Sequence, residues 1–390
     1  MLISADYSVR SEVIDQLRHH NDETLRRLAR LESAMASARI PFGLEPYRQR
    51  LNELCARAKS AATQNLADLQ QGGVLVVEDV LSNTLLVMQF VRLLSTRFAV
   101  PLLRAKTSDR LALHTLAWLH AKHPRTAVFP PAFTSGDTGV WPMTLVTPIY
   151  FLPAFEQDSL LFQSLLFHEF GHLLYACHTQ EMDDLVGELQ RDIGQLLLPP
   201  SQRNDRHDEE QADVRGAIVA RWHTWTQELF CDAVGLVVGG PSFLNAFSGH
   251  LSSMSRGDFY RDESDLIGST HPVTWLRIRL LASRARTLNW NEAADRVESE
   301  WALTAAAMRI TEDYHGFYDE RFRGSVEQRL DDMLTEADPH RCTADEASGR
   351  AASPVGLLNL AWLEFHRDPE KFGAWETARI GDIIDCESGA

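Results

Sequence analysis

One segment, LLFHEFGHLLYACH at residues 165–178, places three histidines and a glutamate in an otherwise apolar and uncharged run. Its length and apolar character predict a buried helix. Within it, HEFGH matches H-E-x-x-H, so His168 and His172 lie one turn apart on the same helix face and can bind one metal ion. Glu169 can reach a water molecule on that metal without being a ligand. The segment therefore predicts a Zn2+ site with Glu169 as general base.

A second apolar helix offers a third zinc ligand. In WHTWTQELFCDAVGLVVGG, residues 222–240, Glu228 and Asp232 lie four positions apart among apolar side chains. Two carboxylates that face a core are costly unless they are paired or bind a metal. We expect Glu228 to bind the zinc. The alternative is a buried carboxylate pair neutralised by an arginine.

His178 is the other candidate for the third ligand, because it follows His172 by six residues. Metzincins use this spacing, but they need a glycine to turn the chain back at the position where this sequence has Tyr175. If the helix continues, six residues rotate His178 by about 240° from His172 and away from the metal. We therefore expect a surface or helix-end histidine.

Charge and cysteine usage exclude several classes of protein. A net charge of −16 over 390 residues argues against a nucleic-acid-binding surface and gives little help for docking on an anionic membrane. The five cysteines are scattered and include no CxxC pair. Neither a disulfide framework nor a cysteine zinc site is indicated, which fits a reducing compartment.

Hydropathy predicts no membrane insertion. The most hydrophobic stretch, VLVVEDVLSNTLLVMQFVRLL from Val74, is interrupted by Glu78, Asp79 and Asn83. Such a stretch is not a transmembrane helix. The N-terminal residues show no signal-peptide pattern. We expect a cytoplasmic protein.

Helical spacing of apolar residues dominates the chain. Residues 9–39 and 45–69 predict a long antiparallel helical hairpin, which is either a packed helical layer or a surface for a protein partner. The other helices are expected over 80–97, 108–122, 158–179, 181–198, 209–239 and several segments within 272–335. Residues 337–353 predict a linker or mobile loop.

The only convincing β region follows Pro124. Its proline, aromatic and β-branched residues predict a hairpin or short sheet, so the expected fold is mainly α with a small β element (α+β). Pro142 and Pro148 exclude a central strand and place residues 143–151 at an edge. An extended substrate could add to this edge as a strand. The residues expected to contact it are Met143, Thr144, Leu145 and Val146.

A third motif, STHPVTWLRIRLL at residues 269–281, contains a His-Pro pair followed by Arg-Ile. With HExxH and the intervening ExxxD, it resembles the HtpX and CAAX prenyl endopeptidase family, whose gluzincin metallopeptidases carry these three elements in this order. The resemblance covers roughly residues 140–285. It implies a zincin-like metallopeptidase core over 124–285, between a helical N-terminal region (1–123) and a helical C-terminal region (286–390).

The resemblance also implies roles for the site residues. Glu228 would be the third zinc ligand, and Asp232 would orient a ligand histidine. His271 and Arg277 would polarise the substrate carbonyl or tie down the site, although His-Pro could simply begin a helix. Members of the family are commonly membrane-embedded, whereas no spanning helix is predicted here.

The expected function is that of a zinc-dependent endopeptidase acting on a protein or peptide substrate, with Glu169 taking a proton from a zinc-activated water. Two other classes stay open. A catalytically inactive zinc-binding scaffold would keep the ligands but would not need Glu169. A helical interaction protein would bind no metal.

Overall fold

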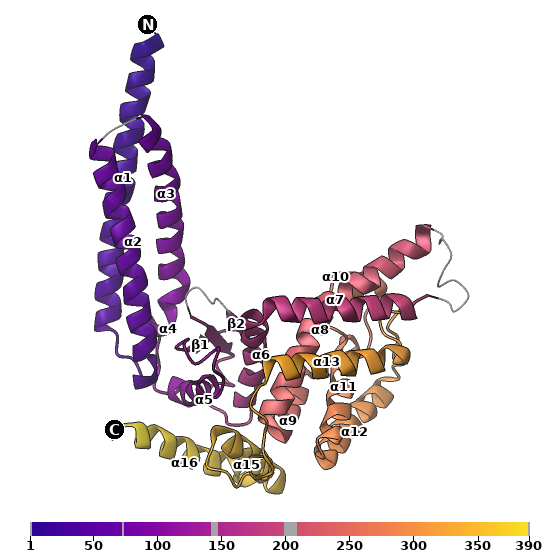
Figure 1. Cartoon of the computed structure of the whole chain (residues 1–390). Coiled ribbons are helices and arrows are strands. Elements are labelled where there is room, and N and C mark those ends of the chain that lie inside the picture. The colour runs from indigo at the N-terminus through magenta and orange to yellow at the C-terminus, as the bar shows by residue number, and fades with distance from the viewer. Residues whose placement is uncertain (1, 72–73, 142–146, 199–208, 389–390) are drawn as a thin grey trace. The chain divides into compact units, whose positions relative to one another are not determined.

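The computed structural model describes residues 2–71, 74–141, 147–198 and 209–388 (Figure 1). It is mainly helical with one small sheet, which confirms the predicted fold class. The α-helices are α1 (Leu2–Ser37), α2 (Glu45–Gln71), α3 (Val74–Leu93), α4 (Val100–Leu103), α5 (Asp109–Ala121), α6 (Leu166–Cys177), α7 (Thr179–Leu196), α8 (Glu209–Gly239), α9 (Pro241–Leu251), α10 (Glu263–Gly268), α11 (Thr274–Thr287), α12 (Asn291–Met308), α13 (Arg323–Ala337), α14 (Ala344–Ala347), α15 (Pro354–Arg367) and α16 (Pro369–Ser388). The strands are β1 (Ala132–Ser135), β2 (Gly139–Trp141) and β3 (Ile149–Leu152).

Shorter helical turns connect several of these elements. A π-helical turn lies between α3 and α4 at Leu94–Phe98, and the 3₁₀ turns are Phe42–Leu44, Gln163–Leu165, Arg256–Asp258 and Glu320–Phe322. The chain forms two compact units. The first comprises Met1–Leu113, Pro130–Thr134 and Leu145–Ile149, and the second comprises His114–Phe129, Ser135–Thr144 and Tyr150–Ala390.

The first unit is built around α1, α2 and α3, which pack against one another in all three pairings (Figure 1). The predicted hairpin of α1 and α2 is therefore covered by a third long helix. Apolar residues at helical spacing, such as Leu28, Met35 and Leu51, are buried between the helices. Burial of such stripes supplies most of the stability of helices this long.

Three polar side chains are also buried in this bundle, one from each long helix. Asn21 Nδ2 donates to Thr84 Oγ1 at 2.9 Å, and Asn65 Nδ2 donates to Asn21 Oδ1 at 3.1 Å. Asn21 Nδ2 also reaches the carbonyl oxygen of Leu17 at 2.8 Å. Each of the three side chains has a partner, so their burial is tolerated and the register of the helices is fixed.

Helix α3 contains the most hydrophobic stretch of the sequence. Val80 and Val91 are buried, whereas Leu81, Leu85 and Leu86 are exposed. Across the described residues, no helix combines the length and the apolar character that a membrane span requires.

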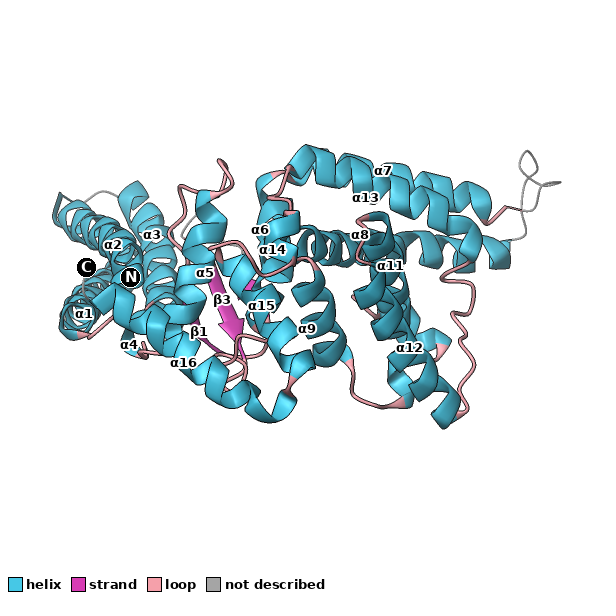
Figure 2. Cartoon of the chain, turned by 90° about the horizontal axis from the view of Figure 1, so that it is seen from below, coloured by secondary structure: helices cyan, strands magenta, loops and turns pink. Residues whose placement is uncertain are grey.

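The second unit is centred on α8, whose residues from Trp225 to Gly240 are almost all buried. Helix α6 makes the most extensive contact with α8, and α7, α9, α11, α13 and α15 also pack on it. Figure 2 shows α7 and α13 side by side along α8. Near the middle of α8, Trp222 Nε1 donates to the carbonyl oxygen of Phe317 at 2.9 Å. A largely apolar helix in the middle of the unit is the expected result of a sequence that is hydrophobic on all sides.

Helix α6 is shorter than predicted. Residues 158–165 form turns and the 3₁₀ turn Gln163–Leu165, and the α-helix begins only at Leu166. Leu160, Leu161 and Leu165 are all buried. Their spacing therefore reflects packing against the core and not a helical repeat. At the other end the helix stops at Cys177, with His178 as its C-terminal cap.

The segment 337–353, for which composition predicts a linker or mobile loop, contains regular structure and packs on the second unit. It contains α14, whose capping box joins Thr343 and Glu346. The backbone N–H of Cys342 donates to the carbonyl oxygen of Val237 at 2.8 Å. Glu346 is buried and lies 3.0 Å from His340 Nε2. Polar residues satisfied by local caps hold this segment against α8, and composition alone does not reveal such caps.

The sheet has the strand order β1-β3-β2. The prediction of an edge position for residues 143–151 is thus wrong for their described part, since β3 is the central strand of the described sheet. Proline does not prevent this arrangement because Pro148 precedes the strand, where its carbonyl oxygen accepts from the N–H of Ala132 at 3.1 Å. Residues 143–146 lie outside the described residues.

Candidate metal centre

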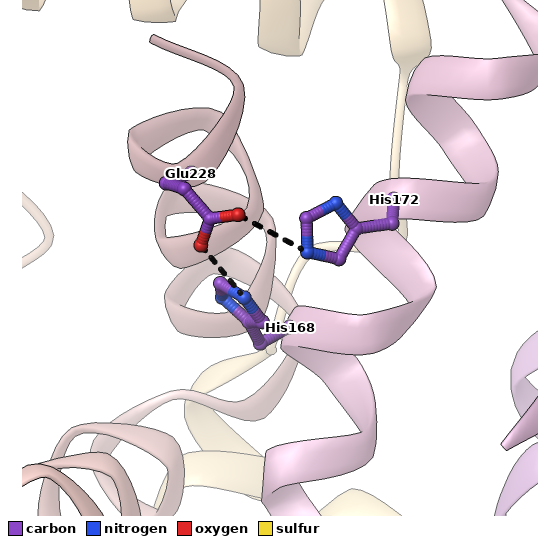
Figure 3. Close-up of side chains that lie close together, drawn as sticks. All are labelled: His168, His172 and Glu228. Carbon is purple, nitrogen blue, oxygen red and sulfur yellow. Dashed lines mark ion pairs between the residues drawn. The ribbon is translucent and has the colours of Figure 1, made fainter. Parts of the chain in front are cut away.

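Three side chains of the second unit converge on one point (Figure 3). His168 and His172 extend from the same face of α6, and Glu228 extends toward them from α8. His168 Nε2 lies 3.5 Å from Glu228 Oε2, and His172 Nε2 lies 3.6 Å from Glu228 Oε1. One donor atom from each residue falls within 4.8 Å of the other two.

This geometry fits a zinc ion. Ligand atoms at zinc–nitrogen and zinc–oxygen distances of roughly 2.0–2.1 Å in a tetrahedron are separated by about 3.4 Å. The observed separations of 3.5 and 3.6 Å need only small adjustments to reach that value. Two imidazoles and one carboxylate form the ligand set of many catalytic zinc sites, which leave the fourth position for water or substrate. The side chains of His168, His172 and Glu228 would hold the ion.

A glycine brings the two ligand-bearing helices together. A Cβ atom added at Gly171, within the HEFGH motif, would lie 2.7 Å from Cys231 Cα and 3.0 Å from Cys231 Cβ. Real Cβ atoms do not approach other atoms this closely, so no larger residue fits without a shift of α6 or α8. The backbone of α8 passes directly over Gly171. This close approach lets Glu228, one turn away on α8, reach both histidines.

Asp232 and Arg277 surround the ligands. Asp232 Oδ1 lies 2.9 Å from His168 Nδ1, which leaves Nε2 as the metal-facing nitrogen. Arg277, on α11, binds Asp232 through two hydrogen bonds of 2.7 and 2.8 Å and reaches Glu228 Oε2 at 3.4 Å. The neutralising arginine of the alternative interpretation is therefore present. It does not account for the two histidine rings directed at Glu228.

The electrostatics of the cluster show that it favours one additional positive charge. Burial lowers the pKa of His168, but hydrogen bonding to Asp232 and Glu228 outweighs this and raises that pKa to about 10. Burial and the charge of His168 lower the pKa of His172 to about 4. Burial raises the pKa of Glu228, but its contacts with His168 and His271 bring it well below the usual range. The carboxylates of Glu228 and Asp232 thus stabilise a proton on His168, and they would also stabilise a metal cation bound in its place.

Glu169 is a buried carboxylate that takes no part in the contacts among His168, Glu228, Asp232 and Arg277. It is 5% exposed, and its carboxylate has no hydrogen bond or ion pair within the part of the chain that the structure describes. Burial raises its pKa, and the charge of Glu228 adds to this effect. Glu169, His168 and Glu228 line a cavity of about 260 Å³. A buried carboxylate with a raised pKa that borders a cavity can exchange protons with a molecule bound there.

His271 lies at the mouth of the same cavity. Its Nε2 is 3.2 Å from Glu228 Oε2, and about half of its side chain (49%) is exposed. A chain of hydrogen bonds holds its backbone, since Arg261 Nη1 donates to Ser269 Oγ at 2.6 Å and that hydroxyl donates to the carbonyl oxygen of His271 at 2.6 Å. Thr270 Oγ1 contacts His271 Nδ1 at 2.8 Å. The third motif therefore meets the other two in space.

Sequence reasoning missed other residues of the site. Phe247 stacks on the ring of His168 and also packs against the Arg277 guanidinium, with 5.5 and 4.9 Å to its ring centre. His250 and Thr138 line the cavity. Phe247 and His250 lie on α9, which follows the Gly-Gly pair that ends α8. The single histidine near the end of this short apolar helix was the only available signal.

Two further predicted positions lie elsewhere. His178 is outside the converging group and ends α6, as expected, but it is buried and not at the surface. The four residues expected to contact substrate, Met143, Thr144, Leu145 and Val146, fall outside the described residues.

Comparisons of the chain with protein-family models, with curated proteins and with solved structures give no match.

Proposed function

We propose that the chain is a zinc-dependent endopeptidase. The observation that carries the proposal is the convergence of His168, His172 and Glu228 beside a cavity whose wall contains Glu169. Hydrolytic zinc enzymes need metal ligands and, separately, a nearby carboxylate that is not a ligand and can move protons. The three converging donors and the separate carboxylate of Glu169 support both requirements. The order of the three motifs, which resembles that of the HtpX and CAAX prenyl endopeptidase family, supports the same reaction class.

In this mechanism each residue has a distinct task. When bound, zinc supplies Lewis acidity that polarises a carbonyl group and makes water more acidic. Glu169 accepts a proton from the water that attacks the carbonyl carbon, and then delivers it to the amine nitrogen as the C–N bond breaks. Burial raises the pKa of Glu169, which makes its carboxylate a better proton acceptor than an exposed one. Asp232 orients the His168 ring, and Arg277 neutralises the Asp232 carboxylate.

His271 is positioned to act on the substrate and not only on Glu228. It is the more exposed of the two residues from the third motif, and it borders the cavity together with Pro272. Arg277 is 5% exposed and engaged with two carboxylates. We therefore assign contact with the carbonyl oxygen of the substrate to His271 and the role of tying down the site to Arg277.

We propose β2, and not the segment that contains β3, as the strand to which an extended substrate would add. Strand β2 lies at an edge of the described sheet, and Thr138, which directly precedes it, lines the cavity. Helix α6 also contacts β2. An extended peptide beside β2 would bring a scissile bond to Glu169. A protein or peptide substrate and a cytoplasmic location remain predictions from the sequence.

The decisive experiment is Glu169→Gln. This change nearly preserves shape but removes the carboxylate that must accept a proton. We expect the variant to fold and to keep zinc at this centre, while cleavage falls by roughly 10²- to 10⁴-fold. Cleavage is measured by identifying new N-termini in a cell lysate treated with each protein, and zinc by elemental analysis. Glu263→Gln, which removes an exposed carboxylate on α10, is the matched control.

Each outcome separates the candidate functions. Zinc without cleavage in both the native protein and the variant indicates a binding scaffold. No zinc in the native protein, even after reconstitution, indicates a helical interaction protein. Full cleavage by zinc-loaded Glu169→Gln protein would refute the assigned role of Glu169.

A further inference from the structure

A second group of metal-binding side chains lies where the chain passes from α6 into α7. His178 caps the C-terminal end of α6, Glu181 lies in the first turn of α7, and Glu336 lies in the last turn of α13. One donor atom from each residue falls within 4.8 Å of the other two. We propose that these three residues bind a second divalent cation of the zinc type. The proposal does not rest on the proposed function.

His178 is the residue that points to a ligand. It is 4% exposed, its Nε2 has no hydrogen-bonding partner within the described residues, and its Nδ1 faces only the Glu336 carboxylate. Its Nδ1 lies 3.4 Å from Glu336 Oε1, which is close to the roughly 3.4 Å that separates two ligands of a tetrahedral zinc ion. A buried ring nitrogen without a hydrogen bond costs stability, and a metal ion at this point would remove that cost.

The local field favours a cation. Helices α6 and α13 both end here, and the carbonyl groups at a helix C-terminus carry a partial negative charge. Glu336 adds a carboxylate to this negative end, where an acidic side chain is unfavourable. Arg125 offsets part of the charge, since its Nη1 donates to the carbonyl oxygen of Cys177 at 2.8 Å and its Nη2 lies 3.8 Å from Glu181 Oε1. The arginine is about half exposed, so its ion pair with Glu181 contributes little.

A neighbouring histidine contacts both His178 and the end of α13. The ring of His123 contacts the ring of His178 edge to face, with 6.0 Å between ring centres. His123 Nε2 lies 2.6 Å from the carbonyl oxygen of Ala337, the last residue of α13. His178 and the end of α13 are therefore both fixed by the same buried ring. A cation here would tie the end of the helix that carries HEFGH to α7 and α13.

The ligand chemistry selects the class of ion. One imidazole and two carboxylates suit zinc and similar borderline divalent ions, whereas calcium and magnesium prefer oxygen alone. Glu181 and Glu336 are exposed, so both can be changed to glutamine without disturbing the core. Asp184 is an exposed carboxylate that lies three residues after Glu181 in α7. The variant Asp184→Asn therefore provides a matched control.

The experiment is equilibrium dialysis of the full chain against buffers of stepped free Zn2+, with zinc per chain measured by elemental analysis. We expect two zinc ions per native chain and per Asp184→Asn chain. The double variant Glu181→Gln/Glu336→Gln should lose at least tenfold in affinity at one of the two sites, since even indirect partners of ligands are worth 10–100-fold. Hydrogen exchange should show zinc-dependent protection around residues 176–182 and 334–338, absent in the double variant.

Three results would overturn the proposal. The first is that the native chain binds no zinc, or binds a single zinc ion that the double variant also binds. The second is a double variant that still binds two zinc ions with unchanged affinity. The third is a second zinc whose binding leaves hydrogen exchange at both segments unchanged, which would show a surface ion bound elsewhere. Because the zinc centre of α6 and α8 is counted separately, failure of either site can be told from failure of the other.

Discussion

Each of the two units buries a cluster of polar side chains, and the clusters are built on opposite principles. In the first unit, Asn21, Asn65 and Thr84 are neutral and hydrogen-bond to one another across three helices. In the second unit, the cluster around His168 and Glu228 is charged, and its donors converge on a point between two helices.

The difference indicates which physical features separate a cluster that only supports the fold from a candidate functional site. The neutral network satisfies its own hydrogen bonds and borders no cavity among those described. The charged cluster raises the pKa of His168 to about 10, lowers that of His172 to about 4 and leaves Glu169 without a partner beside a cavity. Native cores rarely tolerate such an arrangement unless it serves binding or catalysis.

The largest expected effect concerns Arg277. Arg277→Met leaves the Asp232 carboxylate buried without its counter-charge, so we expect the free energy of unfolding to fall by about 3–5 kcal/mol. Urea denaturation of zinc-free protein measures this loss. Asn65→Ala is the counterpart in the neutral network, where one unpaired acceptor on Asn21 should cost only about 1–3 kcal/mol. Equal losses in the two variants would erase the distinction between the clusters.

A second test asks whether His271, the half-exposed member of the charged cluster, contributes to peptide cleavage. His271→Ala should keep zinc but lower turnover, by an amount on the order of 2.7–4 kcal/mol of transition-state stabilisation if His271 contacts the carbonyl oxygen. Steady-state kinetics on a peptide that the native protein cleaves gives the value. Thr270→Ala removes only the hydroxyl that contacts His271 Nδ1 and should have a smaller effect. Unchanged turnover in both variants would indicate that the His-Pro pair only begins a helix and has no role in catalysis.

The third test distinguishes the two clusters by their response to pH, and its expected effect is the smallest when it is counted per pH unit. Asparagine and threonine do not ionise, whereas zinc must displace a proton from His168, whose pKa is raised to about 10. Between that value and the pKa of His172, about 4, zinc affinity should therefore rise about tenfold per pH unit. Chelator competition in the Glu181→Gln/Glu336→Gln background follows this centre alone. An affinity that does not change across neutral pH would contradict the assignment of the displaced proton.

Much of the site could be predicted because its chemistry is encoded at short range. Four positions separate His168 from His172, and four separate Glu228 from Asp232, so the helical repeat alone places each pair on one face. Helix α8 has the predicted bounds because polar residues precede its apolar run and a Gly-Gly pair ends it. The mainly helical class followed from the same spacing.

The parts that could not be predicted depend on contacts between distant segments. The order β1-β3-β2 is set by pairing across loops, and a proline before a strand does not reveal which neighbours that strand will have. Phe247 became part of the site only because α9 folds back over α6, a turn that begins at Gly240, where φ is 65°. Leu160, Leu161 and Leu165 are buried although they precede the helix, so the apolar pattern could not fix the start of α6.

The contact between Gly171 and Cys231 has a consequence for any attempt to rebuild this centre in another protein. A helix pair designed with alanine in the fourth position of the motif (HExAH) would be held apart by the added methyl group, because that group would lie only 2.7 Å from the Cα atom at the position of Cys231. The ligands tolerate little of this, since their separations of 3.5 and 3.6 Å already exceed the tetrahedral value slightly. Gly171 occupies one of the two positions that the H-E-x-x-H pattern leaves free, yet it sets how closely α8 approaches α6 and therefore how close Glu228 comes to the two histidines.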